Sequence, residues 1–257
     1  MLAAPTDGLS LALLVLAGIV ASAINAVAGG GSLVSFPTLV GLGVPPLIAN
    51  ATNAVALWPG SLASAIGFWS KLATVKDDLV RLLLVTLIGS AGGAWLLIST
   101  PQSVFRAVIP GLLLVATLLL AYQPRIKTWS QGRTHRAAPW IAALLQFLVA
   151  IYGGYFGAGM GILMLAVFGL YLAGDIHEHN AIKSWLAVVI NATATLVFLF
   201  AGVVLLVPAL ALMVGALVGG YLGAVWSQKV EAELLRKAIV VLGFVLTAWF
   251  TYQVVAG

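Results

Sequence analysis

Residues 9–44 read LSLALLVLAGIVASAINAVAGGGSLVSFPTLVGLGV, and this stretch decides how the chain folds. An apolar run at 9–28 ends in three consecutive glycines, and a shorter apolar run follows at 32–44. A helix needs about 20 apolar residues to cross the hydrocarbon of a bilayer, so the first run is long enough to span a membrane. Because consecutive glycines weaken a helix, we expect a break here, followed by a short tilted or re-entrant helix.

The rest of the chain has the same apolar character. Of its 257 residues, 62% are apolar and only 7% are charged, whereas a soluble domain carries roughly a quarter charged residues. This composition excludes a soluble enzyme, a nucleic-acid binder and a disordered protein. The absence of cysteine excludes disulfides, thiol catalysis and thiolate metal sites. We therefore expect an all-α integral membrane protein.

Seven further apolar runs are long enough to span or nearly span a membrane, at 47–69, 79–98, 104–122, 140–155, 181–202, 209–225 and 234–255. A second short run, at 160–173, follows a second glycine-rich break at 153–161. The sequence thus predicts eight long helices and two short or re-entrant ones.

The two breaks belong to a duplication with an offset of 130 residues. Matches at this offset include Gly29 with Gly159, Asn50 with Asn180, Arg106 with Arg236 and Gln123 with Gln253. Paired Asn, Arg and Gln residues at one fixed offset are rare by chance in an apolar chain. We therefore expect two transmembrane repeats, 1–123 and 139–257, each with a glycine-broken first element, joined by a basic linker at 124–138.

The lysines and arginines distinguish parallel repeats from inverted ones, because cations favour the cytoplasmic side. With the linker in the cytoplasm, inverted repeats place eleven of the twelve cations on that side and leave only Arg106 outside. Parallel repeats split them seven against five. The charges therefore predict inverted-topology repeats with both termini outside.

Residues that suit an anion site gather at the two breaks and on the helices that follow them. Broken backbone at membrane depth is tolerated where it is buried in protein or lines a cavity, and a helix start offers N–H groups and a positive dipole end. Two such ends meeting near the midplane suit a small anion. The backbone candidates are Gly30, Gly31, Ser32, Gly159, Met160 and Gly161, and the polar side-chain candidates are Asn50, Thr52, Asn53, Asn180, Ser184 and Asn191. The alternatives are a structural kink for the glycines and hydrogen bonds between helices for the polar side chains.

Lys183 completes the candidate site, at the position that Asn53 occupies in the other repeat. An ionisable group inside a span is costly and is read as functional by default, and here it would balance the charge of an anion. The alternative is that Lys183 lies close enough to the helix start to reach the lipid headgroups.

Other motifs have simpler interpretations. The pairs Gly89/Gly93 and Gly215/Gly219 have the small-xxx-small spacing of close helix packing. The His177-Glu178-His179 stretch lacks the i, i+4 spacing of helical metal ligands, so we expect a solvated loop and no metal. Tryptophans near the ends of runs suit anchoring at the membrane interface; they are Trp58, Trp69, Trp129, Trp140, Trp226 and Trp249.

No catalytic arrangement emerges from the sequence. There is no ATP-binding Walker A motif and no Ser/His/Asp set that spacing supports. We expect a carrier or channel with no catalytic residues and no cofactor, rather than an enzyme.

The TauE/SafE family of sulfite exporters has a first-repeat signature that this chain resembles at 28–39 (AGGGSLVSFPTL) and at 43–53 (GVPPLIANATN). The segments at 157–161 (GAGMG) and 180–183 (NAIK) are similar to the second copy of the signature. They depart from it at Met160, where glycine is usual, and at Val167, where the first repeat has Pro37. The resemblance implies a bacterial inner-membrane permease that exports small sulfur-containing anions, such as sulfite or organosulfonates, driven by an ion gradient.

The expected function is therefore a secondary transporter that works by alternating access around a midplane anion site. Its expected partners are a small anionic substrate and the lipid bilayer, and no nucleic acid; a coupling ion (proton or sodium) and a homo-oligomer stay open. The alternatives are a passive anion channel, a transporter of another small anion or organic acid, and an accessory membrane subunit without transport of its own.

Overall fold

The structure is a computed structural model that describes residues 5–27, 30–67, 69–130, 139–172, 176–226 and 232–256. The described residues form helices and no strand. In the first half these are α1 (Gly8–Val27), α2 (Ser32–Gly41), α3 (Pro46–Gly67), η1 (Trp69–Lys71), α4 (Leu72–Ser99) and α5 (Gln102–Ser130). In the second half they are α6 (Pro139–Tyr155), α7 (Met160–Tyr171), α8 (Ile176–Phe200), α9 (Leu206–Trp226) and α10 (Ala232–Ala256). The prediction of an all-α protein with eight long helices and two short ones is confirmed.

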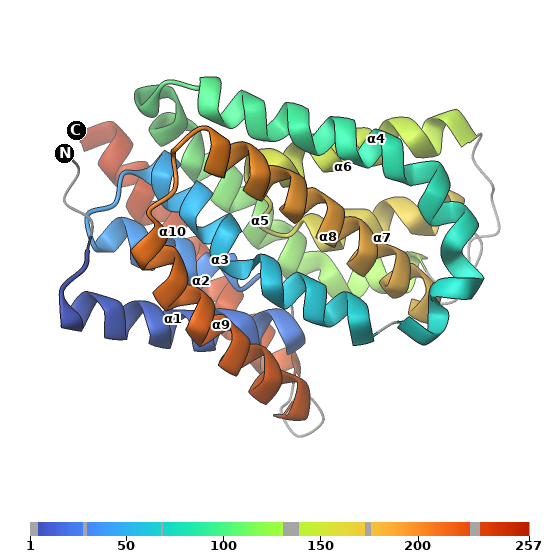
Figure 1. Cartoon of the computed structure of the whole chain (residues 1–257), viewed down its shortest axis with the longest axis horizontal. Coiled ribbons are helices and arrows are strands. Elements are labelled where there is room, and N and C mark those ends of the chain that lie inside the picture. The colour runs from blue at the N-terminus through green and yellow to red at the C-terminus, as the bar shows by residue number, and fades with distance from the viewer. Residues whose placement is uncertain are drawn as a thin grey trace.

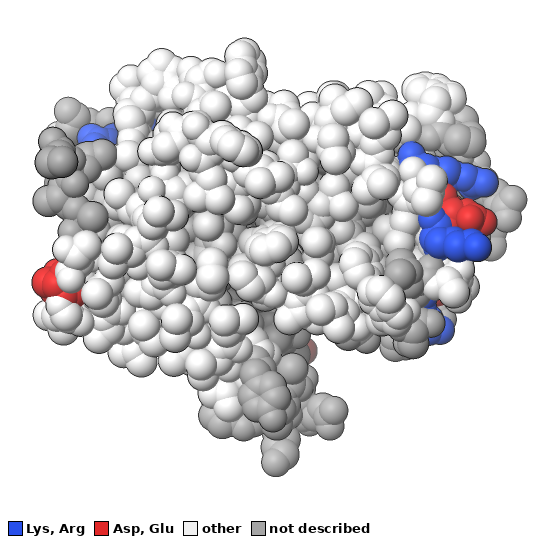
Figure 2. Space-filling model, viewed as in Figure 1, with Lys and Arg blue, Asp and Glu red and all other residues white. Residues whose placement is uncertain are grey.

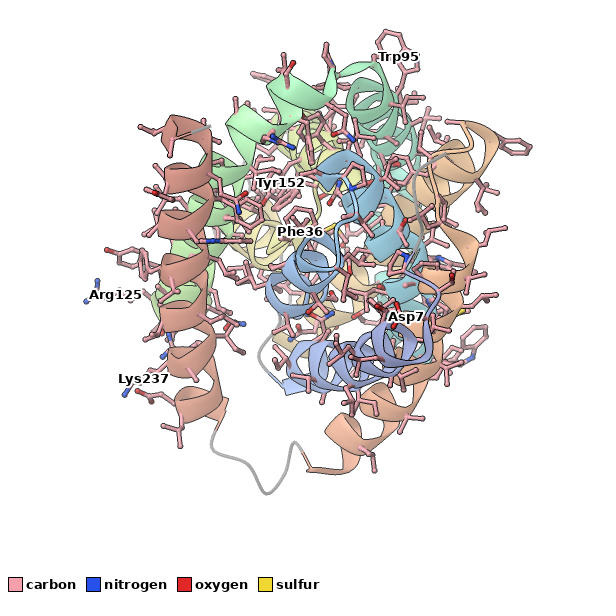
Figure 3. The ribbon with its side chains drawn as sticks, turned by 90° about the vertical axis from the view of Figure 1, so that its left-hand side faces the viewer. Asp7, Phe36, Trp95, Arg125, Tyr152 and Lys237 are labelled. Atoms are coloured by element: carbon pink, nitrogen blue, oxygen red, sulfur yellow. The ribbon has the colours of Figure 1, made fainter. Side chains whose placement is uncertain are left out.

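The surface of the molecule is that of a multi-pass membrane protein. Five helices contain stretches long and apolar enough to cross a membrane, at Gly8–Asn25, Ala73–Ser99, Gln102–Ile126, Glu178–Phe200 and Arg236–Ala256. Large apolar side chains along them are exposed, as a lipid-facing surface requires. Figure 2 shows charged side chains at opposite edges of the molecule, with a broad uncharged band between them. In Figure 3, Phe36 and Tyr152 lie among the helices, whereas Arg125 and Lys237 lie at the margin.

Helix α5 is longer than the apolar run at 104–122 predicts. It continues to Ser130, into the stretch at 124–138 that we expected to be a linker. Thr128 donates its hydroxyl to the carbonyl oxygen of Pro124 at 2.7 Å, and the Arg125 guanidinium lies over the Tyr122 ring at 5.5 Å. Loss of apolar character ends a membrane span, but it does not end a helix. The remaining linker residues, 131–138, lie outside the described residues.

The long helices of each half pack mainly against the other half. Helix α1 packs along α9 and α4 along α6, while α3 contacts both α8 and α9. At the 130-residue offset α1 corresponds to α6 and α4 to α9, so the first two contacts occupy equivalent places. In Figure 1, α3 and α9 run away from the end that carries both termini, whereas α8 and α4 run back towards it. At the 130-residue offset α3 corresponds to α8 and α4 to α9, so helices at equivalent positions run in opposite directions.

Glycines let these long helices approach to backbone contact. A Cβ on Gly93 of α4 would lie 2.1 Å from the carbonyl oxygen of Ile151 in α6. A Cβ on Gly219 of α9 would lie 2.0 Å from the carbonyl oxygen of Ile19 in α1. Gly89 and Gly215 make similar contacts. The predicted packing role of these four glycines is confirmed.

Candidate functional site

The first break, between α1 and α2, is held by a side chain of α1. Gly30 has a φ of 86°, a backbone conformation that residues other than glycine adopt only with strain. The N–H of Gly31 donates to Asn25 Oδ1 at 2.7 Å, and the N–H of Val34 donates to the carbonyl oxygen of Gly31 at 2.9 Å to open α2. The break is therefore a built turn in which the Gly31 N–H already has an acceptor. Residues 28 and 29 lie outside the described residues.

The second break, between α6 and α7, is stabilised by hydrogen bonds from its own half and from the first half of the chain. Gly157 and Gly159 each have a φ of 77°. The hydroxyl of Tyr152 donates to the carbonyl oxygen of Ala158, and the N–H of Met160 donates to the carbonyl oxygen of Gly157 at 3.2 Å.

The end of α6 at this break also depends on the first half. Asn50 of α3 donates from Nδ2 to the carbonyl oxygen of Tyr155 at 2.9 Å. This bond satisfies a carbonyl that the helix end leaves without an intrahelical partner.

Both breaks lie against the same stretch of α5. A Cβ on Gly30 would lie 3.2 Å from Leu120 Cδ2, and a Cβ on Gly159 would lie 3.5 Å from Leu119 Cδ1. The breaks therefore lie at the same level along α5, with apolar side chains of that helix against each of them.

Lys183, Asn180 and Gly161, three of the predicted site residues, lie together. Lys183 donates from Nζ to Asn180 Oδ1 at 2.8 Å, one turn earlier on α8. A Cβ on Gly161 of α7 would lie 3.3 Å from Lys183 Cδ, so the missing side chain leaves room for the lysine stem. The half-buried cation is thus beside the start of α7, as a countercharge near the second break would have to be.

Most of the other polar candidates form hydrogen bonds between the first and the second half of the chain. Thr52 of α3 accepts from the N–H of Leu205 at 3.1 Å, just before α9 begins. Asn191 of α8 donates from Nδ2 to Ser61 Oγ of α3 at 2.8 Å. Among the described residues, the buried Asn53 Oδ1 and Ser184 Oγ have no hydrogen-bond partner.

The expectation of a solvated loop at 177–179 is wrong for His179. This residue lies in the first turns of α8 and is only 3% exposed. Its Nε2 is 3.2 Å from the carbonyl oxygen of Leu172, and its ring meets Phe168 edge-on. Helix α8 begins earlier than the apolar run predicts and packs this turn against α7. In the described parts of the chain, no three His, Asp or Glu residues are grouped as metal ligands would be.

Trp58 is the residue that the sequence interpretation misplaced. Trp69 and Trp140 are 62% and 67% exposed, as interfacial anchors are. Trp58 lies near the middle of α3 instead, and its Nε1 is buried with no partner among the described residues. Its distance from both ends of the apolar run was the signal that could have separated it from the anchors.

Asp7 and Glu233, which lie outside the candidate spans, accept hydrogen bonds in the first turns of α1 and α10. Asp7 accepts the N–H of Ser10 at 3.0 Å, and hydrogen bonds from Ser10 hold the pKa of Asp7 below its usual range. Glu233 accepts a hydrogen bond from Lys237 at 2.8 Å, which lowers the pKa of Glu233 in the same way. Figure 3 labels Asp7 and Lys237.

Comparison with known proteins gives one family. A model of the family described as sulfite exporter TauE/SafE matches residues 14–250. A probable membrane transporter protein of Haemophilus influenzae is 30% identical over 95% of this chain and 95% of its own length. The probable membrane transporter protein YfcA of Escherichia coli K12 is 26% identical, over 95% of this chain and 91% of its own. No solved structure matches the chain.

Proposed function

The chain belongs to the sulfite exporter TauE/SafE family, and from this we propose that it is a secondary transporter that exports small sulfur-containing anions across the bacterial inner membrane. Sulfite and organosulfonates are the substrates we propose. The observation that carries the proposal is the family match across residues 14–250, which covers both halves and both breaks. The relatives are named probable membrane transporter proteins, which supports transport rather than catalysis.

Two inverted repeats, 1–123 and 139–257, would supply the moving parts of this transporter. The equivalent contacts α1–α9 and α4–α6 and the opposed directions of α3 and α8 support this part of the proposal. Hydrogen bonds from Asn50 and Asn191 join the halves. Rocking one half against the other would break and remake such bonds as access alternates between the two sides.

The orientation of these repeats can be measured directly, because a chain without cysteine gives no labelling background. Single cysteines at Thr6 and Ala256 should react with an impermeant thiol reagent added outside the cell. A cysteine at Thr128, at the exposed end of α5, should react only after the cytoplasmic side is opened. Cytoplasmic labelling of both termini would overturn the proposed orientation.

The thirteen predicted residues at the breaks and on α3 and α8 are the anion site that we propose, with Lys183 as countercharge. Gly161 and Asn180 support this role, because they hold the lysine beside the start of α7.

Transport by the purified chain in proteoliposomes tests the function and the countercharge together. Sulfite, thiosulfate, sulfoacetate and sulfate, with an uncharged control, should reveal saturable flux and counterflow for at least one anion. Lys183→Ala should raise the KM for that anion by about tenfold, which corresponds to ~1.4 kcal/mol of lost binding. The control is Lys76→Ala, which removes an exposed lysine of α4.

Three other outcomes have distinct meanings. Flux that does not saturate and shows no counterflow would indicate a passive channel. No flux at all would contradict the proposed function and favour an accessory subunit. An unchanged KM in Lys183→Ala would remove Lys183 from the site.

A further inference from the structure

We propose that the anion site extends between α3 and α8, where Trp58, Ser61 and Thr195 join Asn191 in holding the transported anion. We call these four residues the axial site. This inference rests on the proposed function, because it adds residues to the substrate site of that transporter. Helices α3 and α8 pack together and run side by side through the centre of the molecule (Figure 1).

The hydrogen bond between Asn191 and Ser61 locates the axis that relates the two halves. The two residues are 130 positions apart, which is the offset of the duplication, and Asn191 Nδ2 is 2.8 Å from Ser61 Oγ. In a molecule with two-fold symmetry, a residue can touch its own counterpart only at the axis. In inverted repeats that axis lies in the plane of the membrane, where transporter sites are found. The Ser61–Asn191 contact therefore marks the middle depth of the protein.

Helical spacing brings two further polar groups to the same contact. Trp58 precedes Ser61 by three residues on α3, and Thr195 follows Asn191 by four residues on α8. Residues three or four apart are neighbours on one side of a helix. Since Ser61 and Asn191 face each other, Trp58 and Thr195 flank the place where the two helices meet.

These flanking groups lack partners. Trp58 Nε1 and Thr195 Oγ1 are buried, and no described residue forms a hydrogen bond with either atom. An indole N–H is only a donor, and a hydroxyl can donate one hydrogen bond. Ser61 accepts the bond from Asn191 and so keeps its own proton to donate. Buried polar groups are ordinarily hydrogen-bonded, so these unpaired donors are available to bind a ligand between α3 and α8.

The donors specify the chemical class of that ligand. A molecule with several acceptor oxygens and a negative charge, as in sulfite or a sulfonate, can accept from the indole and both hydroxyls. Helix α3 contains no acidic residue, and Glu178, near the start of α8, is the one acid on that helix. Neither helix therefore places a carboxylate at the axial site to repel an anion. Neutral donors can hold an anion by hydrogen bonds without adding a second buried charge to the site.

Binding of sulfite to purified full-length protein in detergent, measured by calorimetry, tests the axial site. Thiosulfate, sulfoacetate and sulfate complete the panel. Trp58→Phe and Thr195→Val should each raise the Kd of the bound anion about tenfold, because each removes one hydrogen bond to a charged ligand. The matched controls are Trp95→Phe, at a 63% exposed indole of α4, and Thr193→Val, two residues from Thr195 and on another side of α8. Both controls should bind like the original protein.

The binding results distinguish failure of the axial site from failure of the proposed function. If the original protein binds an anion and neither axial variant weakens binding, the axial site is wrong while the proposed function stands. If the original protein binds no anion in the panel, the proposed function fails and the axial site fails with it. Thr195→Val preserves side-chain shape, so it still tests the site if Trp58→Phe does not fold.

Discussion

The contact between α1 and α9 and the contact between α4 and α6 occupy equivalent places, yet they are built from different residues. A Cβ on Gly18 of α1 would lie 2.1 Å from the carbonyl oxygen of Leu212 and 2.9 Å from the nitrogen of Ala216. The position equivalent to Ala216 on α4 is Thr86, at the 130-residue offset. Thr86 accepts from Gln146 Nε2 of α6 at 3.1 Å, and both side chains are fully buried.

The difference shows two ways to hold helices together in lipid, where apolar burial adds no driving force between them. The α1–α9 contact relies on close backbone approach, whereas the α4–α6 contact adds a polar pair at the equivalent place. Two contacts related by the 130-residue offset can thus share a packing geometry while different residues produce it.

The largest effect is expected from Gly18→Leu in the α1–α9 contact. The new Cβ would meet the backbone of Leu212, which cannot move without separating the helices. Overpacking of this kind costs about 1–3 kcal/mol and sometimes more. The melting temperature in detergent and the fraction of monodisperse protein should both fall sharply.

Gly92→Leu is the matched control for this change, because nothing lies within 4 Å of a Cβ built at Gly92 of α4. Equal stability of the two variants would contradict the backbone contact of α1 with α9.

A smaller effect is expected from Gln146→Leu in the α4–α6 contact. The change leaves the buried Thr86 hydroxyl without its partner, at a cost of about 0.6–2 kcal/mol. The double variant Gln146→Leu/Thr86→Ala removes both polar groups, so it should be more stable than the single variant. A thermal double-mutant cycle measures this coupling, and strictly additive effects would show that the pair does not stabilise the contact.

The smallest effect concerns the first turn of α1 and its dependence on pH. Hydrogen bonds from Ser10 lower the pKa of Asp7 in the folded protein. The ionised Asp7 therefore stabilises this turn fully above its unfolded pKa of about 3.9. That stabilisation is lost as the pH falls through the lower folded pKa. Exchange of the Ser10 amide hydrogen, compared with Asp7→Ala, checks this; an identical pH dependence in both proteins would refute it.

Much of the fold follows from local patterns in the sequence. The apolar runs and the glycine breaks predict ten helices and the places where α2 and α7 begin, because span length and helix breaking are local properties. The end of α5 could not be predicted in this way, since residues beyond the bilayer remain helical without an apolar pattern.

The polar side chains of the candidate site form hydrogen bonds with residues that are distant in the sequence. Asn50 bonds a carbonyl oxygen 105 residues away, and Thr52 bonds an N–H 153 residues away. The sequence shows that these side chains need partners in a membrane, but only the packing of α3 determines which ones they find. The burial of His179 is also non-local, because Phe168 of α7 and the carbonyl oxygen of Leu172 surround its ring.

The contact between Ser61 and Asn191 also bears on the history of the gene. Under the proposed duplication, an ancestor with one repeat paired with a second copy inserted upside down, and residue 61 met itself across the interface. Fusion of two such copies would have made the two positions separate codons, so that one could become Ser and the other Asn. Fusion would also have allowed lysines to lie on one side of the bilayer only, because in a pair of oppositely inserted copies every lysine would have been present on both sides.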